Sequence, residues 1–205
     1  MILASGLDTR AYRLPWPGGT TVYEIDQPQV VEFKTKALAA LGAATTAEHR
    51  AVGIDLRHDW PGKLRDTGFD TSRPAAWSAE GFLPFLPTDA QDRLLDSVTA
   101  LSAVGSRFVG ETLGPSGELH AMMHTRTRAA VDRWRQHGFD IDLTELGYVG
   151  ERNDAAAYLQ SRGWTTASTK VADLFVENGL RLPVDEAAEQ ALMSESFTYF
   201  TATRI

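Results

Sequence analysis

The strongest constraint on the fold of this chain is that extended apolar segments alternate with helical patterns along most of its length. The strand-like segments are rich in β-branched and aromatic residues, and the segments between them place apolar residues at helical spacing. The expected strands are residues 1–4, 20–26, 49–56, 74–81, 106–111, 164–168 and 196–203. Such alternation is typical of an α/β protein whose parallel sheet carries helices on both faces.

The first fourteen residues combine a short apolar run, a small-residue turn at Ser5-Gly6 and a segment rich in helix formers. In open α/β sheets, a strand, a tight glycine turn and a helix start form a cradle for a cofactor at the carboxyl edge of the sheet. Gly6 has no side chain, so a ligand can approach the backbone there. One glycine alone is a weak signal, because a dinucleotide fingerprint has three.

Three successive expected strands, the second to the fourth, end in or next to an acidic residue, namely Asp26, Asp55 and Glu80. Ligands of open α/β sheets bind beyond the carboxyl ends of the strands, so these three acids predict a ligand site. Asp26 is the strongest candidate, since a carboxylate after the second strand can accept hydrogen bonds from both hydroxyls of a ribose. Its alternative role is to cap the following helix, but Pro28 at the first helical position moves the cap to Gln27.

The other two acids leave more than one interpretation open. Asp55 can accept a hydrogen bond from the amino group of an adenine while the Leu56 amide donates to a ring nitrogen. From spacing alone, a simple turn acid within residues 55–59 is an equally good interpretation of Asp55. Glu80 can lie near the sulfur end of a ligand or near an acceptor, although its spacing alone favours a solvated loop acid.

Two helix predictions are specific enough to be checked. The helix that begins at Pro28 is expected to end at Gly42 and to bury one apolar face. That face consists of Val30, Phe33, Ala37, Leu38 and Leu41. Thr88 and Gln91 have the spacing of a capping box at the start of a later helix.

Composition narrows the classes of partner. The chain has 205 residues, 43% of them hydrophobic, which is enough for one domain with a substantial core. A net charge of -7 argues against nucleic acid or an anionic membrane as the main partner. There are no cysteines, and His120 and His124 lack a nearby third ligand, so we expect no metal. Without a signal peptide or a membrane-spanning run, the expected location is the cytoplasm.

Four motifs, in order along the chain, carry a resemblance to a known family. They are residues 4–14 (ASGLDTRAYRL), 23–28 (YEIDQP), 55–57 (DLR) and 79–86 (AEGFLPFL). Together they resemble a bacterial group of S-adenosylmethionine-dependent methyltransferases that is common in actinobacteria and related to the leucine carboxyl methyltransferases. The resemblance implies a Rossmann-like class I methyltransferase sheet of seven strands, mostly parallel, with helices on both faces. Its last strand, residues 197–203 in this chain, would be antiparallel.

The resemblance also implies roles for the candidate residues. The acid matching Asp26 and the pair matching Asp55-Leu56 contact S-adenosylmethionine in the family. The turn matching Ser5-Gly6 lies under the methionine part of the cofactor, and the acid matching Glu80 lines the same cleft. Members usually carry a helical N-terminal segment that this sequence lacks, so we expect residues 1–205 to be a single, N-terminally truncated methyltransferase domain.

We therefore expect methyl transfer from S-adenosylmethionine to an oxygen of a small molecule or a carboxylate. A carboxylate acceptor needs no general base, whereas a hydroxyl acceptor does, and the sequence names no such base. The sequence leaves two alternatives open: an inactive fragment or pseudoenzyme that keeps the fold, and an NAD-dependent oxidoreductase with a Rossmann sheet.

Overall fold

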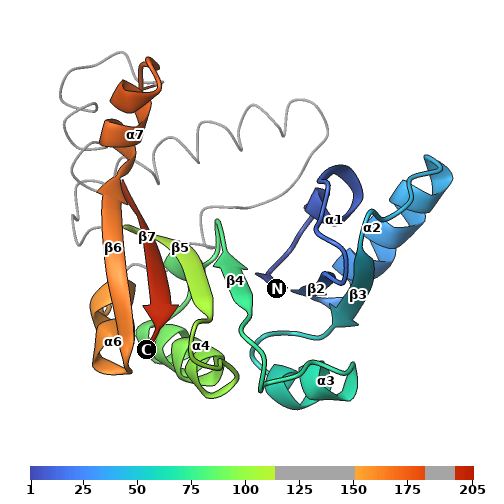
Figure 1. Ribbon diagram of the computed structural model, residues 1–205, viewed down its shortest axis with the longest axis horizontal. Helices are drawn as coiled ribbons and strands as arrows, with labels where there is room; N and C mark the ends of the chain where they lie inside the picture. Colours follow the sequence, from blue (N-terminus) through green and yellow to red (C-terminus); the bar gives the residue numbers. More distant parts are fainter. Residues whose placement is uncertain (114–150, 183–196) are drawn as a thin grey trace, which may run out of the picture.

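The computed structural model describes residues 1–113, 151–182 and 197–205, which build one seven-stranded sheet with helices packed on it (Figure 1). The strands are β1 (Ile2–Leu3), β2 (Thr21–Asp26), β3 (Glu48–Gly53), β4 (Ala76–Ala79), β5 (Arg107–Leu113), β6 (Trp164–Lys170) and β7 (Phe197–Arg204). The helices are α1 (Arg10–Arg13), α2 (Pro28–Ala40), α3 (Trp60–Asp66), the 3-10 turn η1 (Leu83–Phe85), α4 (Thr88–Ala100), α6 (Ala155–Ser161) and α7 (Val171–Glu177).

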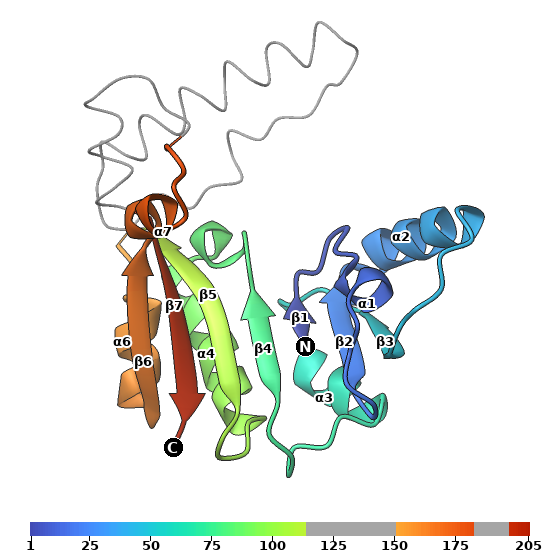
Figure 2. The same cartoon turned by 45° about the horizontal axis from the view of Figure 1, so that its top comes forward.

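The strands lie in the order β3-β2-β1-β4-β5-β7-β6. The pairs among β3, β2, β1, β4 and β5 are parallel, while β7 is antiparallel to both β5 and β6. Figure 2 shows β7 running against its two neighbours. The expected fold class is confirmed, including the reversed final strand.

The core has two parts because both faces of the sheet are covered. Leu3, Tyr23 and Ile25 face the larger cluster, which also contains buried residues of α3, α4 and α6. Ile2 and Val22 face the other side and pack with Ala11 of α1. Alternate residues of β1 and β2 therefore point to opposite faces, as a buried parallel strand requires.

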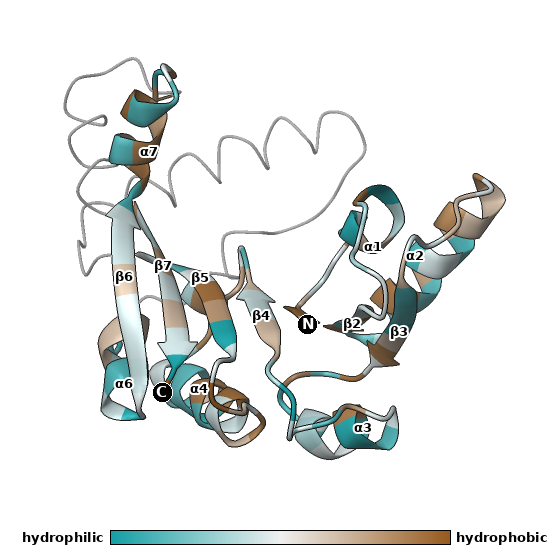
Figure 3. Ribbon diagram, in the orientation of Figure 1, coloured by the Kyte–Doolittle hydropathy of each residue, from teal (hydrophilic) through white to brown (hydrophobic). Residues whose placement is uncertain are grey.

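The predicted apolar face of α2 is partly wrong. Phe33 is 62% exposed and Leu41 is 81% exposed, whereas the residue that α2 buries is Lys34. The helix covers the outer strands β2 and β3, so only a narrow face of it meets the sheet. Figure 3 shows hydrophobic residues at the end of α2 that lies away from the sheet. The end of the helix is as predicted, with Gly42 in the left-handed region at φ 69°.

The predicted capping box at the start of α4 is also wrong. The N-cap residue is Pro87, and neither predicted side chain caps the helix. Thr88 Oγ1 donates to the Glu151 carbonyl, and Gln91 Nε2 donates to the Asn153 carbonyl at 2.9 Å. Tertiary contacts with residues 151–153 have replaced the local cap.

His120 and His124, for which the sequence predicts no metal, lie outside the described residues. In the part of the chain that the structure describes, none of the helices has the length and apolar character needed to span a bilayer.

Candidate functional site

The candidate site is the carboxyl edge of strands β1 to β4. The turn after β1 is tied to β2, since the Ser5 amide donates to the Ile25 carbonyl at 3.0 Å. The end of β2 is tied to the chain leaving β3, since the Ile54 amide donates to the Asp26 carbonyl at 2.8 Å. These backbone bonds bring the segments that carry Gly6, Asp26 and Asp55 to one edge of the sheet.

The turn after β1 has an unusual backbone. Ala4 has φ 48° and Gly6 has φ 47°, so two residues within three positions adopt the left-handed conformation. For Ala4 this conformation is strained, and such strain persists where the surrounding structure holds it. A Cβ built on Gly6 would meet no atom within 4 Å, which leaves open space above the turn. The turn therefore has room for a ligand to lie directly against its backbone.

Asp26 closes this turn from the neighbouring strand. Its Oδ2 accepts from the Gly6 amide at 2.6 Å, and its Oδ1 accepts from the Gln27 amide at 2.7 Å. The cap of α2 is Gln27, as the sequence predicts, so Asp26 is not the capping residue. A carboxylate has about four lone-pair positions, so two remain for a ligand. The fixed orientation of Asp26 above the turn is the main geometric feature of the site.

Asp55 lies near this edge but is engaged by its own neighbour. Its carboxylate accepts from the Arg57 amide at 2.9 Å and forms an ion pair with Arg57 Nη2 at 2.6 Å. The hydrogen bonds from the Arg57 side chain, then its amide, lower the pKa of Asp55 to about 2. The Arg57 side chain is 78% exposed, so it can turn toward solvent and free the carboxylate for another donor. Leu56 packs its side chain against the larger core cluster.

This pair gives a direct pH prediction. In the Arg57→Ala variant we expect the pKa of Asp55 to rise from about 2 toward roughly 3.9, the value of an unperturbed aspartate. Folding lowers the pKa of this carboxyl, so the carboxyl stabilises the fold at pH values above its pKa in the unfolded chain. This stabilisation is lost as the pH falls toward the folded-state pKa of about 2. An NMR titration of the Asp55 carboxyl carbon measures the shift. An unchanged pKa in the variant would show that Arg57 is not its cause.

Glu80 is held at the same edge by an arginine from the first turn. Arg10 Nη1 bonds Glu80 Oε1 at 2.8 Å, and Arg10 Nη2 pairs with Asp8 Oδ2 at 2.6 Å. Burial, the largest single influence, raises the pKa of both carboxyls, but the hydrogen bonds and charge of Arg10 leave both below their usual range. Ser78 Oγ adds a hydrogen bond to Glu80 Oε1 at 2.7 Å. Arg10 thus ties the turn after β1 to the end of β4.

Sequence reasoning missed three residues of this edge: Asp8, Arg10 and Glu111. Glu111, in β5, accepts from the amides of Gly81 and Phe82 just after β4. Burial raises its pKa, the two amides lower it, and the net shift is upward. Glu111 ends the expected fifth strand, so the rule that selected the other strand-end acids would have selected it too. Asp8 and Arg10 follow the glycine turn directly, but no rule of spacing assigned them to Glu80.

A buried ion pair lies behind Asp26 on the same strand. Glu24 Oε2 is 2.5 Å from Lys34 Nζ of α2 and 3.0 Å from His49 Nε2 of β3. The side chains of Glu24 and Lys34 are 2% and 6% exposed. Because a buried charge is costly without its partner, this pair fixes α2 against β2 two residues before Asp26.

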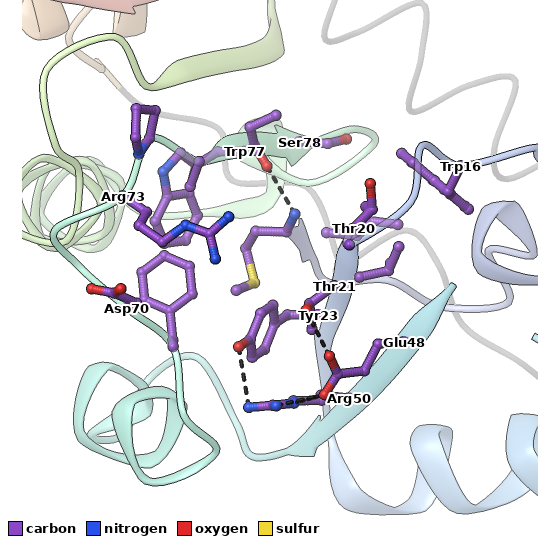
Figure 4. Close-up of a pocket in the computed structure, with 18 of the residues that line it drawn as sticks. Trp16, Thr20, Thr21, Tyr23, Glu48, Arg50, Asp70, Arg73, Trp77 and Ser78 are labelled. Atoms are coloured by element: carbon purple, nitrogen blue, oxygen red, sulfur yellow. Dashed lines mark hydrogen bonds and ion pairs between the residues drawn. The ribbon is translucent and has the colours of Figure 1, made fainter. Parts of the chain in front are cut away.

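The structure therefore brings Ser5, Gly6, Asp26 and Glu80 together around one turn, with Asp55-Leu56 beside them. Their role in holding a cofactor stays a prediction. Among the described residues, no group of three or more histidine, aspartate or glutamate side chains is arranged to hold a metal ion. A cavity of about 850 Å³ is lined by Arg10 and Ser78 but by none of the six predicted residues (Figure 4).

The chain is similar to known proteins over most of its length. The leucine carboxyl methyltransferase family matches residues 1–99. A protein of Mycobacterium avium (strain 104), named as an S-adenosyl-L-methionine-dependent methyltransferase, is 58% identical over 187 residues, covering 91% of this chain and 59% of the relative. A protein of the same name from Mycolicibacterium smegmatis is 53% identical over 205 residues, covering all of this chain and 66% of the relative. The chain thus spans roughly three fifths to two thirds of these relatives' length.

Solved structures share the fold at low sequence identity. Magnesium protoporphyrin IX methyltransferase from Synechocystis PCC 6803 with bound SAH matches with a TM-score of 0.52 at 12% identity, covering 100% of this chain and 73% of that one. An O-methyltransferase family protein from Burkholderia thailandensis matches with a TM-score of 0.53 at 13% identity, covering 99% and 49%. At this identity the likeness shows the fold alone.

Proposed function

Because the chain belongs to the S-adenosylmethionine-dependent methyltransferases related to the leucine carboxyl methyltransferases, we propose that its carboxyl edge binds S-adenosylmethionine and that the protein methylates an oxygen of a small molecule. The observation that carries the proposal is the bond from the Gly6 amide to Asp26, at 2.6 Å. It sets a carboxylate with free lone pairs over a glycine turn that has open space above it.

The residues at this edge fit the cofactor chemically. The free lone pairs of Asp26 suit the two hydroxyls of a ribose, and the open turn at Ser5-Gly6 suits a chain that passes close to the backbone. Once the Arg57 side chain turns away, the Asp55 carboxylate can accept a hydrogen bond from the adenine amino group. The Leu56 amide can donate a hydrogen bond to a ring nitrogen of the adenine. Asp8 and Glu80 carry two negative charges, and Arg10, which pairs with both, carries one positive charge. The remaining negative charge favours binding of the positively charged groups at the methionine end of the cofactor.

When bound, S-adenosylmethionine supplies a methyl group on a sulfonium, so that attack by an acceptor oxygen breaks the carbon–sulfur bond and leaves its electron pair on sulfur. The protein's own contribution is to hold and align the acceptor. Glu111 fixes the amides of Gly81 and Phe82, and thereby shapes the chain between β4 and η1. An ionised carboxylate acceptor needs no proton removed, whereas a hydroxyl acceptor needs a base.

An assay with S-adenosylmethionine labelled on its methyl group tests this function. The chain is incubated with a panel of small carboxylates, phenols and amines, and label is followed into the extracted products. We expect labelled product with at least one oxygen acceptor, and alkaline hydrolysis then separates methyl esters, which release labelled methanol, from methyl ethers, which do not. The Asp26→Ala variant is the negative control. Label found only on nitrogen or carbon acceptors would contradict oxygen methylation.

A further inference from the structure

Glu111 is the acid of the carboxyl edge that lies farthest from the expected adenine site. It belongs to β5, which follows β3, β2, β1 and β4 in the strand order. In the proposed complex, the adenine, the ribose and the methionine chain lie at the ends of β3, β2 and β1. The cofactor so placed leaves the ends of β4 and β5 for the acceptor.

Three side chains form a row across β4, β5 and β7 at this end of the sheet. Ala79 is in register with Gly110, so the next residues along these parallel strands, Glu80 and Glu111, stand side by side. Glu111 is also directly opposite Tyr199 of the antiparallel strand β7. Residues in register on neighbouring strands point to the same face of the sheet. Tyr199 is 47% exposed, so part of an aromatic ring is open to a ligand beside the Glu111 carboxylate.

The Glu111 carboxylate is held by one of its two oxygens. Oε1 accepts hydrogen bonds from the amides of Gly81 and Phe82, the second at 3.2 Å. In the part of the chain that the structure describes, no donor is bonded to the other oxygen, Oε2. The carboxylate therefore has a set direction and keeps the lone pairs of Oε2 for a further donor.

The surroundings of Glu111 also favour its action as a base. Burial, the largest influence, raises its pKa, the two amides lower it, the charge of Glu80 raises it, and the net shift is upward. The ionisable groups beside it are Glu80, to which Arg10 of α1 is bonded, and Tyr199 of β7. A carboxylate with a raised pKa takes a proton more readily than an exposed one.

The charges at this end of the site favour a neutral acceptor over an anionic one. Among the described residues after β1 and at the ends of β4 and β5, Asp8, Glu80 and Glu111 are acidic. Arg10 is basic and is already shared by Asp8 and Glu80. A carboxylate acceptor would add a negative charge next to Glu111, and like charges at close range repel. A hydroxyl group is neutral and can donate a hydrogen bond to Oε2.

We propose that the acceptor is a phenol whose ring lies beside Tyr199 and whose hydroxyl donates to Glu111 Oε2, which makes Glu111 the general base. This inference rests on the proposed methyl transfer and names its substrate class. The phenol oxygen forms a bond to the methyl carbon, which breaks the carbon–sulfur bond and leaves its electron pair on sulfur. The hydroxyl proton passes to Oε2 and is lost to water after the ether leaves. A phenol suits a carboxylate base better than an alkanol does, because its pKa of about 10 is closer to that of a carboxyl.

The Glu111→Gln variant tests the base, because its amide oxygen can still accept from the Gly81 and Phe82 amides. Transfer of labelled methyl to phenol is followed between about pH 6 and about pH 9, below the pKa of phenol itself. In the unchanged chain we expect a nearly constant rate over this range, since ionised Glu111 takes the proton. In the variant we expect a rate about 100-fold lower or more at neutral pH. That rate should rise roughly tenfold per pH unit, because the variant can use only the phenolate ion.

Glu32→Gln is the matched control, since Glu32 is exposed on α2 and pairs with Lys36 at the surface. It should keep the rate and the pH profile of the unchanged chain. A Glu111→Gln chain with the same rate and pH profile as this control would overturn the proposal. Label on carboxylates but not on phenol would overturn it and leave the proposed methyl transfer standing, whereas absence of label on every acceptor would overturn both.

A second measurement uses the unchanged chain and needs no turnover. With S-adenosylhomocysteine bound, NMR of the Glu111 carboxyl carbon gives its pKa in the presence of phenol or of anisole, which has the same ring but no hydroxyl. A hydrogen bond from phenol to Oε2 stabilises the ionised carboxylate, so we expect a lower pKa with phenol than with anisole. The same pKa with both compounds at saturation would overturn the proposal.

Discussion

The Asp26→Ala variant is expected to bind S-adenosylhomocysteine about 100-fold more weakly than the unchanged chain. Two hydrogen bonds from ribose hydroxyls to a charged acceptor contribute about 1.5 kcal/mol each or more, so their loss costs about 3 kcal/mol. The substitution also leaves the Gly6 amide without the acceptor that now lies at 2.6 Å. Isothermal titration calorimetry with S-adenosylhomocysteine measures the effect directly.

Asp66→Ala is the matched control, since Asp66 is an exposed aspartate at the end of α3. It removes the same charge without touching the turn after β1. We expect it to bind S-adenosylhomocysteine like the unchanged chain. An Asp26→Ala chain that stays folded and binds within threefold of the control would show that Asp26 does not hold the ribose.

The Lys34→Met variant is expected to unfold far more easily than the unchanged chain. It would leave the Glu24 carboxylate buried, with the His49 imidazole as its remaining polar neighbour at 3.0 Å. Removing one partner of a buried ion pair costs about 3–5 kcal/mol of unfolding free energy, and the nearby His49 places the expected value near the lower end. For a domain of this size, 3 kcal/mol corresponds to roughly 6–12 °C in melting temperature. Thermal and urea unfolding measure both quantities.

Lys36→Met on the same helix is the control for this prediction. Lys36 pairs with Glu32 at the surface and its side chain is 74% exposed, so its loss should cost less than about 1 kcal/mol. The double variant Glu24→Leu/Lys34→Met should recover most of the stability, because it leaves no unpaired charge in the core. A Lys34→Met chain as stable as the Lys36→Met chain would mean that the buried pair does not fix α2 on β2.

Most of the fold follows from local patterns in the sequence. Strands such as β2 and β7 are marked by β-branched and aromatic residues, and Gly42 follows the end of α2 in the left-handed region as predicted. The reversed direction of β7 came from the family resemblance. The errors in α2 and at the start of α4 share one cause, namely tertiary contacts that local patterns do not contain. Lys34 is buried because of Glu24 on another element, and Thr88 bonds Glu151 across 63 positions.

The sequence was enough to predict where the candidate site lies, but not which side chains contact one another in it. The rule that strand-end acids meet at one edge found Asp26, Asp55 and Glu80, and the structure places them there. The rule does not say which donor each acid meets. Arg10 bonds Glu80, 70 positions away in the sequence, and Arg57 pairs with Asp55. Both contacts depend on backbone geometry, which the spacing of residues in the sequence does not determine.

A crystal structure of this chain with S-adenosylhomocysteine tests the central claim most directly. We predict the two ribose hydroxyls within hydrogen-bond distance of the Asp26 carboxylate, the adenine beside Asp55-Leu56, and the homocysteine chain over the turn at Ser5-Gly6. Ligand bound at another surface, with the carboxyl edge of β1 and β2 empty at saturating concentration, would contradict the cofactor assignment.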